Sequence, residues 1–483
     1  MTLCIVCPLR CRRVGLIAAA GVLAVGRVVS AQTLGIAAPP SLLLANYDRV
    51  PVGQREGLEA GAFVARTNDA GSGWYNPAGL AQHGGTAVNG SATAYEWTRL
   101  TLSGFGITTD RAKLSSVGTF IGVVLGQPVL RSDRWRVGAS LTRPVAWNPS
   151  AFNVAFHPPT GSADQLVGYA SRVDLRTMTP AVSIGYAPGG VGKSKVRVGV
   201  GLAYAQTSIT QTQSVSDRAT SPASATTRLR SFSAEGTMAS GVVTGGLQWD
   251  LSPRATLGLR VVSPGLRLFG STRLALEGSE FSGSSARDVT FHDEHASFHY
   301  KHPLEADAAL MLPFPRGQIE VDVRYYGSVR RYALYESDSI ARVRVAADAA
   351  APIVSSAPYT TTYHAAASVT NIAVGGNYQI MRGVRVHTGF LIDGSPTPSE
   401  TESIFANADL YRVTAGLSFT GTSLSGSIGL AYGWGAGDYR GLGTTPTSIP
   451  AATGLEVRTL NLMYALSYAF GQKSNRRGAT GTD

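Results

Sequence analysis

The sequence predicts an all-β protein, a closed antiparallel transmembrane β-barrel of about 14 strands. Three observations lead to this fold class: an export signal at the N-terminus, strands with one wholly apolar face, and aromatic residues gathered at strand ends. The chain also holds 56 glycines and only 15 % charged residues, a composition that suits many short strands joined by tight turns.

Residues 1–31 have the pattern of a cleavable signal peptide. Arg10, Arg12 and Arg13 form a positive region, the apolar run 14–26 follows, and Val29-Ser30-Ala31 is a small-residue cleavage site. The alternative is a membrane anchor, but the run is too short to span a bilayer. All three cysteines lie in this segment, so the mature chain is expected to use neither disulfides nor thiolate chemistry.

The stretch 70–82, AGSGWYNPAGLAQ, shows neither strand alternation nor helical spacing. Pro77 fixes its own φ and biases Asn76 toward extended geometry, and the Asn side chain can bond nearby backbone. Trp74 and Tyr75 are amphipathic, and Ala78 completes the turn. Taken alone, this stretch is also compatible with a surface turn before the first strand.

The C-terminal stretch 459–470 gives the clearest strand signal, because successive strand residues point to opposite faces. Its even positions are apolar or aromatic: Leu460, Leu462, Tyr464, Leu466, Tyr468 and Phe470. Similar alternation occurs in 195–204, 318–326, 411–419 and 423–434.

A secreted β-sandwich would alternate too, with its apolar face inward. Aromatics at strand ends together with the export signal favour an apolar face toward lipid, and lipid admits only helices or closed barrels. Residues 85–471 hold roughly fourteen such runs, each about 28 residues with its connection, against ~9–11 residues for a spanning strand. We therefore expect short turns on one side, long loops on the other, and a polar tail at 472–483.

Two motifs imitate other chemistry. Residues 187–194, APGGVGKS, resemble a phosphate loop, but an alternating strand follows where a helix would be needed, so we predict a Gly-rich hairpin turn.

The His-rich stretch 292–302 would place three histidines together only on a helix. On a strand its ends are about 33 Å apart at ~3.3 Å per residue. We predict a polar extracellular loop there and no metal site, with metal binding as the alternative.

The other function classes have little support. The net charge of +11 is spread along the chain, so no nucleic acid partner is expected. There is no Gly-x-Ser-x-Gly elbow and no cofactor motif, so we predict a protein that is not an enzyme and binds no cofactor. A barrel lipase or protease remains an alternative.

A general diffusion porin for small polar solutes is the stronger alternative, because polar residues alternate into the lumen: Glu320, Asp322, Arg324, Arg385 and Arg412.

Several fragments in order resemble the FadL-like family of long-chain fatty acid outer-membrane transporters. They are AGSGWYNPAGLA, GASLTRPVAW with Pro144, GYASRVDLRTMTPAVSIGYAP with Pro180, the run GVVTGGLQWDLSPRATLGLRVVSPGLRLFGST, and GGNYQIMRGVRVHTGFLIDGSPTPSE with Asp393, Ser395 and Pro396.

The resemblance implies a 14-stranded barrel, residues 85–471, whose lumen holds a plug formed by residues 32–84, with Asn76-Pro77-Ala78 at its heart. It implies passive uptake of hydrophobic solutes, which extracellular loops capture and which leave sideways where one strand is kinked. Expected partners are hydrophobic small molecules, outer-membrane lipid and lipopolysaccharide, and the protein is expected to be a monomer in the outer membrane.

The chain departs from the family at 206–228. This stretch is rich in Ser, Thr and Gln, where the family has an apolar capture loop. A solute such as an aromatic hydrocarbon is therefore an alternative to fatty acid. The tail after Phe470 is a second departure.

Overall fold

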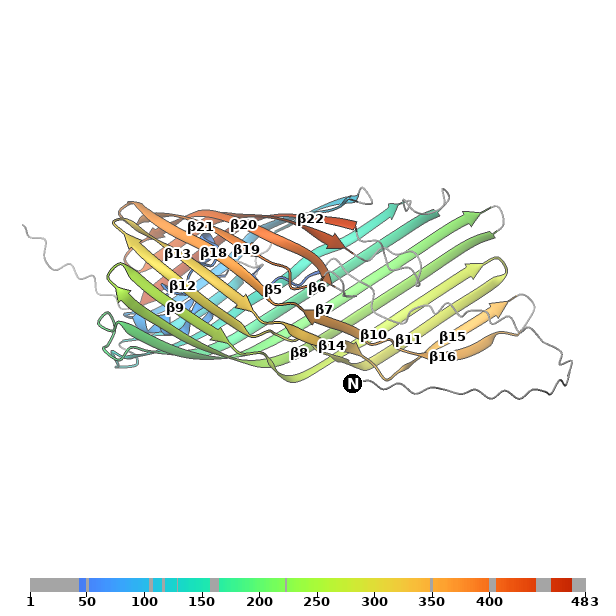
Figure 1. Ribbon diagram of the computed structural model, residues 1–483, viewed down its shortest axis with the longest axis horizontal. Helices are drawn as coiled ribbons and strands as arrows, with labels where there is room; N and C mark the ends of the chain where they lie inside the picture. The colour runs from blue at the N-terminus through green and yellow to red at the C-terminus, as the bar shows by residue number, and fades with distance from the viewer. Residues whose placement is uncertain are drawn as a thin grey trace, which may run out of the picture. The chain divides into compact units, whose positions relative to one another are not determined.

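A ring of antiparallel strands encloses a short N-terminal segment in the computed structural model of this chain (Figure 1). The structure describes residues 43–48, 52–103, 107–114, 118–127, 129–156, 165–221, 224–347, 351–398, 405–439 and 453–470. No helix among these residues is long and apolar enough to cross a membrane. The predicted signal peptide 1–31 and the predicted tail 472–483 lie outside the described residues, and both stay predictions.

The wall consists of twenty-one strand segments. The first seven are β2 (Thr86–Leu102), β3 (Ile107–Leu114), β4 (Gly118–Leu125), β5 (Trp135–Phe156), β6 (Gln165–Tyr186), β7 (Val196–Ser221) and β8 (Ser224–Ser252). The next seven are β9 (Ala255–Val262), β10 (Leu266–Ser282), β11 (Ser285–Phe298), β12 (Glu305–Phe314), β13 (Gly317–Tyr326), β14 (Val329–Glu336) and β15 (Ile340–Ala347). The last seven are β16 (Ile353–Pro358), β17 (Thr362–Ala366), β18 (Val369–Met381), β19 (Val384–Asp393), β20 (Phe405–Thr420), β21 (Leu424–Tyr439) and β22 (Thr453–Phe470).

These segments make fourteen barrel strands, because interruptions divide five of the strands. The divided strands are β3–β4, β9–β10, β11–β12, β13–β14–β15 and β16–β17–β18. β2 pairs with β22 from Thr86↔Phe470 to Leu102↔Leu455, which closes the ring. Closure pairs the first strand of the barrel with the last, as lipid requires. The predicted closed antiparallel barrel of about 14 strands is confirmed.

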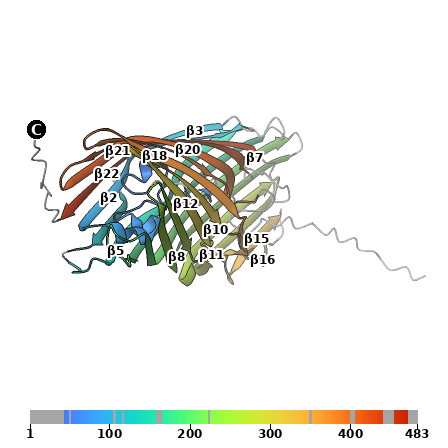
Figure 2. The same ribbon diagram turned by 60° about the vertical axis from the view of Figure 1, so that its left-hand side comes forward.

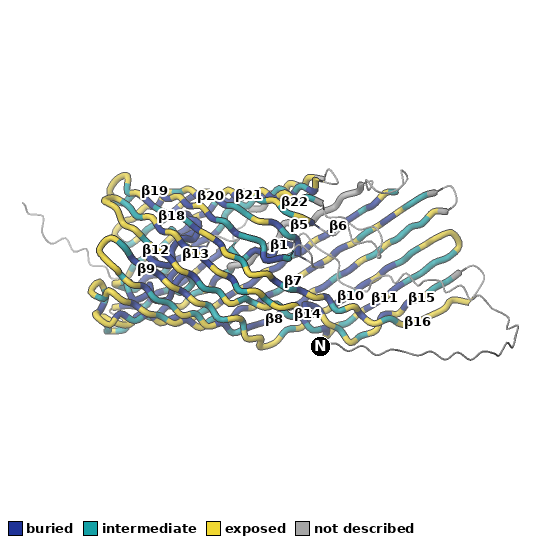
Figure 3. Tube along the Cα trace, viewed as in Figure 1, coloured by how far each residue is buried: buried dark blue, intermediate teal, exposed yellow. Residues whose placement is uncertain are grey.

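Buried and exposed residues alternate along the strands (Figure 3), and between the two ends of the wall many of the exposed residues are large and apolar. On β13 the outward residues Ile319, Val321, Val323 and Tyr325 are 42 % to 44 % exposed, whereas Glu320 is fully buried in the lumen. Exposure of a whole row of large apolar side chains is typical of a lipid-facing barrel wall. The predicted orientation of the alternating strands is therefore confirmed.

Aromatic side chains mark both borders of this apolar surface. Near the end where β12 turns into β13, which we call the plug end, one belt contains Trp135, Tyr186, Trp249, Phe314, Tyr378, Phe419, Tyr468 and Phe470. The opposite border contains Tyr204, Tyr325, Tyr411 and Trp434. Aromatic girdles at these positions fit the two interfaces of a membrane.

Beyond the second belt, the wall continues as long strands toward what we call the loop end. The outward face of β7 is apolar from Val196 to Tyr204 and then polar from Gln206 onward. β7 and β8 have 26 and 29 residues and are joined by residues 222–223 alone. Where the family resemblance implies a capture loop, the described residues of 206–228 continue the paired strands β7 and β8: period-2 alternation persists with Ser and Thr outside, and the ladder satisfies the backbone groups.

The His-rich stretch also belongs largely to the wall. β11 extends to Phe298 and pairs with β10, so the predicted loop at 292–302 is wrong for His292 and His295, which lie on an exposed strand face. His292 bonds Glu294, and Arg273 of β10 pairs with the same carboxylate. The phosphate-loop imitation at 187–194 lies in the turn between β6 and β7, as predicted, and Gly190 and Gly192 adopt φ of 86° and 73° there.

The segment inside the ring contains β1 (Leu43–Leu44), the 3-10 helices η1 (Gly57–Glu59) and η2 (Pro77–Gln82), and the helix α1 (Ser72–Tyr75). Figure 2 shows blue helical turns of this segment among the strands of the plug end. β1 pairs in parallel with Phe405 and Ala406 of β20. The described residues from 43 to 85 thus form a plug within the lumen; residues 32–42 of the predicted plug lie outside the description, and its boundaries stay predictions.

Glycines of the wall let the plug backbone approach closely. Gly185, Gly199 and Gly246 are paired neighbours on β6, β7 and β8, and a Cβ atom on any of them would overlap residues 76–81 of the plug. Gly375 and Gly389 face Glu59 in the same way. Small residues at these register positions therefore shape the seat of the plug.

Replacing Gly246 by Val is expected to displace the plug, because the new side chain would overlap Asn76 and overpacking of this kind costs about 1–3 kcal/mol. Gly245, the next residue, has no heavy atom within 4 Å of an added Cβ, and Gly245→Val is the matched control. Limited proteolysis of the folded barrel, checked by heat-modifiable migration on gels, should cut the plug faster in Gly246→Val alone. Equal cutting of both variants would contradict this seat.

Candidate functional site

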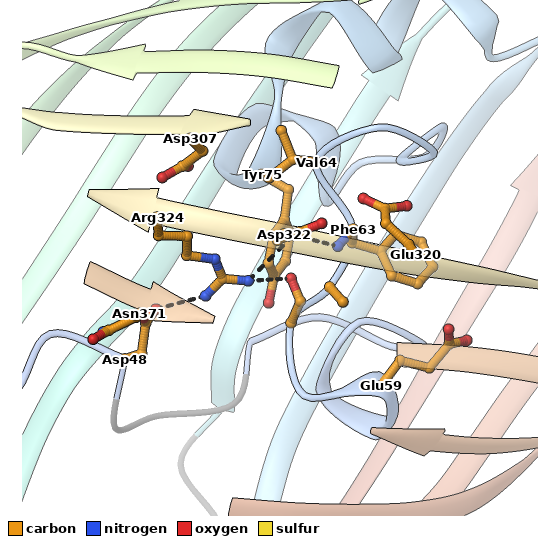
Figure 4. A network of polar contacts seen from close by, with 12 residues as sticks. Asp48, Glu59, Phe63, Val64, Tyr75, Asp307, Glu320, Asp322, Arg324 and Asn371 are labelled. Carbon is orange, nitrogen blue, oxygen red and sulfur yellow. Dashed lines mark hydrogen bonds and ion pairs between the residues drawn. The ribbon is translucent and has the colours of Figure 1, made fainter. Parts of the chain in front are cut away.

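Three alternating residues of β13 form a charged ledge inside the barrel: Glu320, Asp322 and Arg324. Their side chains are almost completely buried. Asp322 Oδ2 accepts a hydrogen bond from the backbone N–H of Phe63 at 3.0 Å, and Glu320 Oε1 accepts one from that of Ala65 at 2.7 Å (Figure 4). The ledge therefore holds the plug by its backbone.

Arg66 of the plug lies between two carboxylates. Its Nε donates to Glu320 Oε2 at 2.8 Å, and its Nη2 pairs with Glu59. Glu59 Oε1 also lies 2.5 Å from His387 Nδ1 of β19 and accepts a bond from Asn377 of β18 at 3.0 Å. Burial alone would raise the pKa of Glu59, but Arg66 and His387 outweigh it and hold that pKa below its ordinary value. The plug is thus locked to three strands of the wall.

A second lock joins the first described residues of the plug to the same side of the barrel. Arg324 Nη1 donates to Asp48 Oδ1 at 2.7 Å, and Asn371 donates to both Asp48 and Asp393, each at 2.9 Å. Asn46 donates to the backbone carbonyl of Asp393 at 2.9 Å. These bonds use up the polar groups that would otherwise line a water-filled passage.

Asn76 and Pro77 form the turn between α1 and η2. Asn76 is fully buried; its Oδ1 accepts from Ala78 N–H at 3.1 Å, and its Nδ2 donates to the carbonyls of Val64, Leu247 and Leu259. One side chain thus joins two parts of the plug to β8 and β9. The sequence predicted local bonds of Asn76 but not these bonds to the wall.

The other predicted site residues are spread over several places. Trp74 contributes its carbonyl to Arg260, and the hydroxyl of Tyr75 donates to Val52 O at 2.7 Å. Pro144 lies at a register shift of β5, and Pro180 lies on the outward face of β6. Ser395 donates its N–H to Asp409, and the carbonyl of Pro396 accepts from Ala367.

The structure brings only part of this set together. Asp393 reaches the start of the plug through Asn371, whereas Pro144 and Pro180 belong to the wall. Sequence reasoning missed Glu59, Arg66 and His387, because the contacts between plug and wall, Arg66 with Glu320 and Glu59 with His387, join positions more than 250 residues apart. Glu320, Asp322 and Arg324 were recognised as lumen-facing, but they bind the plug instead of lining a polar channel.

Between the plug and the loop end, the lumen is apolar. One continuous cluster of buried side chains joins strands from all sides of the wall. We call it the upper lumen; it includes Leu43, Leu44, Leu100, Leu175, Ile209, Phe232, Met238, Leu274, Phe291, Phe298, Leu334 and Val457. Water-filled porins have a polar interior, so this lumen suits apolar solutes far better than ions.

The pairing of the wall is interrupted between β3 and β5. β4 pairs with β5 from Leu125↔Val137 to Phe120↔Thr142, but β3, which continues that strand toward the loop end, makes no ladder with β5 within the part of the chain that the structure describes. β2 carries bulges at the same height, between Ser91 and Tyr95. Unpaired backbone at membrane height is costly, so this interruption is a specific feature of the wall.

The lock around Arg66 should be essential for seating the plug. Arg66→Met leaves Glu59 and Glu320 buried without their cation, a change that costs about 3–5 kcal/mol. Hydrogen exchange of the plug amides, read by mass spectrometry, should accelerate more than tenfold. Arg273→Met, which removes an ion pair on the exposed outer face, is the control and should leave that exchange unchanged. Protected plug amides in Arg66→Met would refute the lock.

The plug should be seated more firmly at low pH. Burial, with help from the charge of Asp69, raises the pKa of Glu56 from 4.5 to about 8, while Arg55 opposes the shift. The seated plug therefore holds this proton more tightly than the free segment, and seating should weaken as pH rises from about 4.5 to about 8. Plug hydrogen exchange, corrected for its intrinsic pH dependence, should show this trend, and Glu56→Gln should reduce it. An unchanged trend in Glu56→Gln would contradict this assignment.

No family model and no curated protein matches this sequence. Solved structures do match its fold. The CymD monoaromatic hydrocarbon channel superposes with a TM-score of 0.53 at 13 % identity, over 88 % of this chain and 99 % of that one. A FadL homologue from Pseudomonas aeruginosa gives 0.54 at 13 % identity over 88 % and 100 %. The Pseudomonas putida toluene transporter TodX gives 0.53 at 12 % identity over 89 % and 100 %. At this level of identity the likeness establishes the fold: this chain has the barrel architecture shared by the FadL homologue and the monoaromatic hydrocarbon channels.

Proposed function

We propose that this protein resides in the bacterial outer membrane as a monomer and passively takes up hydrophobic solutes, long-chain fatty acids or related apolar compounds. The apolar upper lumen carries the proposal. A passage lined by Phe232, Phe298 and Leu334 solvates hydrocarbon and excludes ions, since burying apolar surface is favourable and burying charge is not.

The plug end of the lumen supports a sideways exit. A solute that descends through the upper lumen meets plug residues fixed by buried ion pairs. The interruption between β3 and β5 lies in the wall beside this region and offers a path into the membrane. The names of the matching structures, which include toluene transporters, support the proposed uptake of hydrophobic solutes. The lipid-facing belts of the wall support the proposed place in a membrane.

A general diffusion porin is the competing function. It would need an open polar lumen, but Glu320, Asp322 and Arg324 are buried beneath the plug. We propose no catalytic activity and no cofactor; among the described residues no group of three or more His, Cys, Asp or Glu is arranged to hold a metal ion. As a monomer in the outer membrane, the barrel is surrounded by lipid and lipopolysaccharide.

Deleting residues 35–80 distinguishes the two functions. The intact protein should carry almost no ion current in planar bilayers, whereas the deletion variant should conduct measurably, since the ledge would then be exposed to water. Cells that express the intact protein should take up labelled toluene or oleate faster than cells with an empty vector. A large conductance of the intact protein, without hydrocarbon uptake, would favour the porin instead.

A further inference from the structure

A chain of uncharged polar side chains crosses the upper lumen. Tyr169 of β6 and Tyr439 of β21 have their hydroxyl oxygens 3.2 Å apart. Gln213 of β7 donates to Tyr169 Oη at 3.2 Å, and Gln211 donates to Gln213 Oε1 at 3.3 Å. Tyr335 of β14 donates to Gln211 Oε1 at 3.5 Å. We call these five residues the crossbar.

The crossbar joins parts of the wall that are distant in the ring. β6 and β7 are neighbours, but β21 and β14 belong to other sectors of the barrel, so these bonds span the lumen instead of following a ladder. All five side chains are at most 3 % exposed. A solute that moves from the loop end to the plug must therefore separate them.

Apolar side chains of β6 and of other strands of the wall pack around the crossbar. Phe232 lies opposite Gln213 and Val173 opposite Gln211, and Phe298 stacks on Tyr335 with ring centroids 5.7 Å apart. In such surroundings a donor or acceptor that loses its partner loses much of the energy of its hydrogen bond. Opening the crossbar for a pure hydrocarbon breaks its bonds without replacing them, although Gln213 also donates to Ser171 at 3.3 Å. A solute with its own hydroxyl or carbonyl replaces the lost bonds.

The crossbar contains no charged side chain. The nearest lumen-facing charge on β7 is Asp217, which lies closer to the loop end and accepts a bond from Gln165; Arg230 of the neighbouring β8, opposite Val215, lies on the same side. Tyrosine hydroxyls and glutamine amides both donate and accept, so they match a neutral group of either kind.

We propose that the crossbar is a selectivity site, which favours hydrophobic solutes that carry one neutral hydrogen-bonding group, such as a phenol or an alcohol, over hydrocarbons of the same size. This inference rests on the proposed uptake of hydrophobic solutes and narrows their class. A site built to hydrogen-bond a hydroxyl discriminates strongly against the analogue that lacks it.

The experiment compares three solutes of similar size: 4-methylphenol, toluene and 4-methylbenzoate. Initial uptake of each labelled compound is measured in cells that express the protein, after subtracting cells with an empty vector. We expect the phenol to exceed toluene by about tenfold or more and 4-methylbenzoate to be taken up least.

The double variant Tyr169→Phe, Tyr439→Phe keeps the rings and removes both hydroxyls, and Gln213→Met removes the amide. Both should bring the ratio of phenol to toluene close to one, with toluene uptake unchanged or faster. Tyr204→Phe, on the lipid-facing side of β7, is the matched control and should keep the ratio of the original protein. Heat-modifiable migration on gels verifies that each barrel folds.

Equal uptake of phenol and toluene by the original protein would overturn the crossbar as a selectivity site but leave hydrophobic uptake intact. A ratio that the crossbar variants do not change, or a preference for 4-methylbenzoate, would overturn it as well. Uptake of none of the three compounds would overturn the proposed function and this inference together.

Discussion

Three side chains of one strand determine what the lumen of this barrel can be. Glu320, Asp322 and Arg324 are buried inside the wall, and buried charges require partners. The plug supplies them through the N–H groups of Phe63 and Ala65 and through Arg66 and Asp48. The buried charges of β13 need the plug as their partner, and the plug needs these charges to bind its N–H groups and Arg66. The plug therefore stays seated, and the polar half of the lumen is closed to water. The wall glycines that face the plug leave room for this contact, because a Cβ atom at their positions would overlap the plug.

The lumen is divided as a consequence. Near the plug it is polar and held by many ion pairs and hydrogen bonds, and toward the loop end it is mainly apolar and crossed by Tyr169, Gln213 and Tyr439. In the proposed function the two halves have different tasks: the first fixes the plug against ion flow, and the second offers surface on which a hydrophobic solute replaces water. The interrupted pairing of β3 and β5 lies at the plug end of this path. The seated plug, the apolar upper lumen and the interrupted pairing of the wall together support the proposed exit of the solute through the side.

The sequence was most informative where a pattern repeats over short distances. Alternation in 318–326 predicted that Ile319 and Val321 face lipid and that Glu320 faces the lumen, and the aromatic ends of strands predicted the belts. At 206–228 the resemblance implied a capture loop, but the described residues there extend β7 and β8, because Ser and Thr also suit the outer face of a strand that continues beyond the membrane. The His-rich stretch failed similarly, because His292 and His295 are exposed on β11. No local pattern could reveal the contacts that join distant parts of the chain. These are the bonds of Asn76 to Leu247 and Leu259, the pairing of Arg66 with Glu320, and the contact of Tyr169 with Tyr439.

The most direct test is to locate a hydrophobic solute inside the protein. Crystals grown with bromobenzene, recorded at the bromine absorption edge, would show the ligand as an anomalous peak. The account predicts a peak in the upper lumen, among Phe232, Phe298 and Leu334, with the plug still bound to the ledge of β13. Peaks confined to the outer, lipid-facing wall, with ordered water filling the upper lumen, would contradict it.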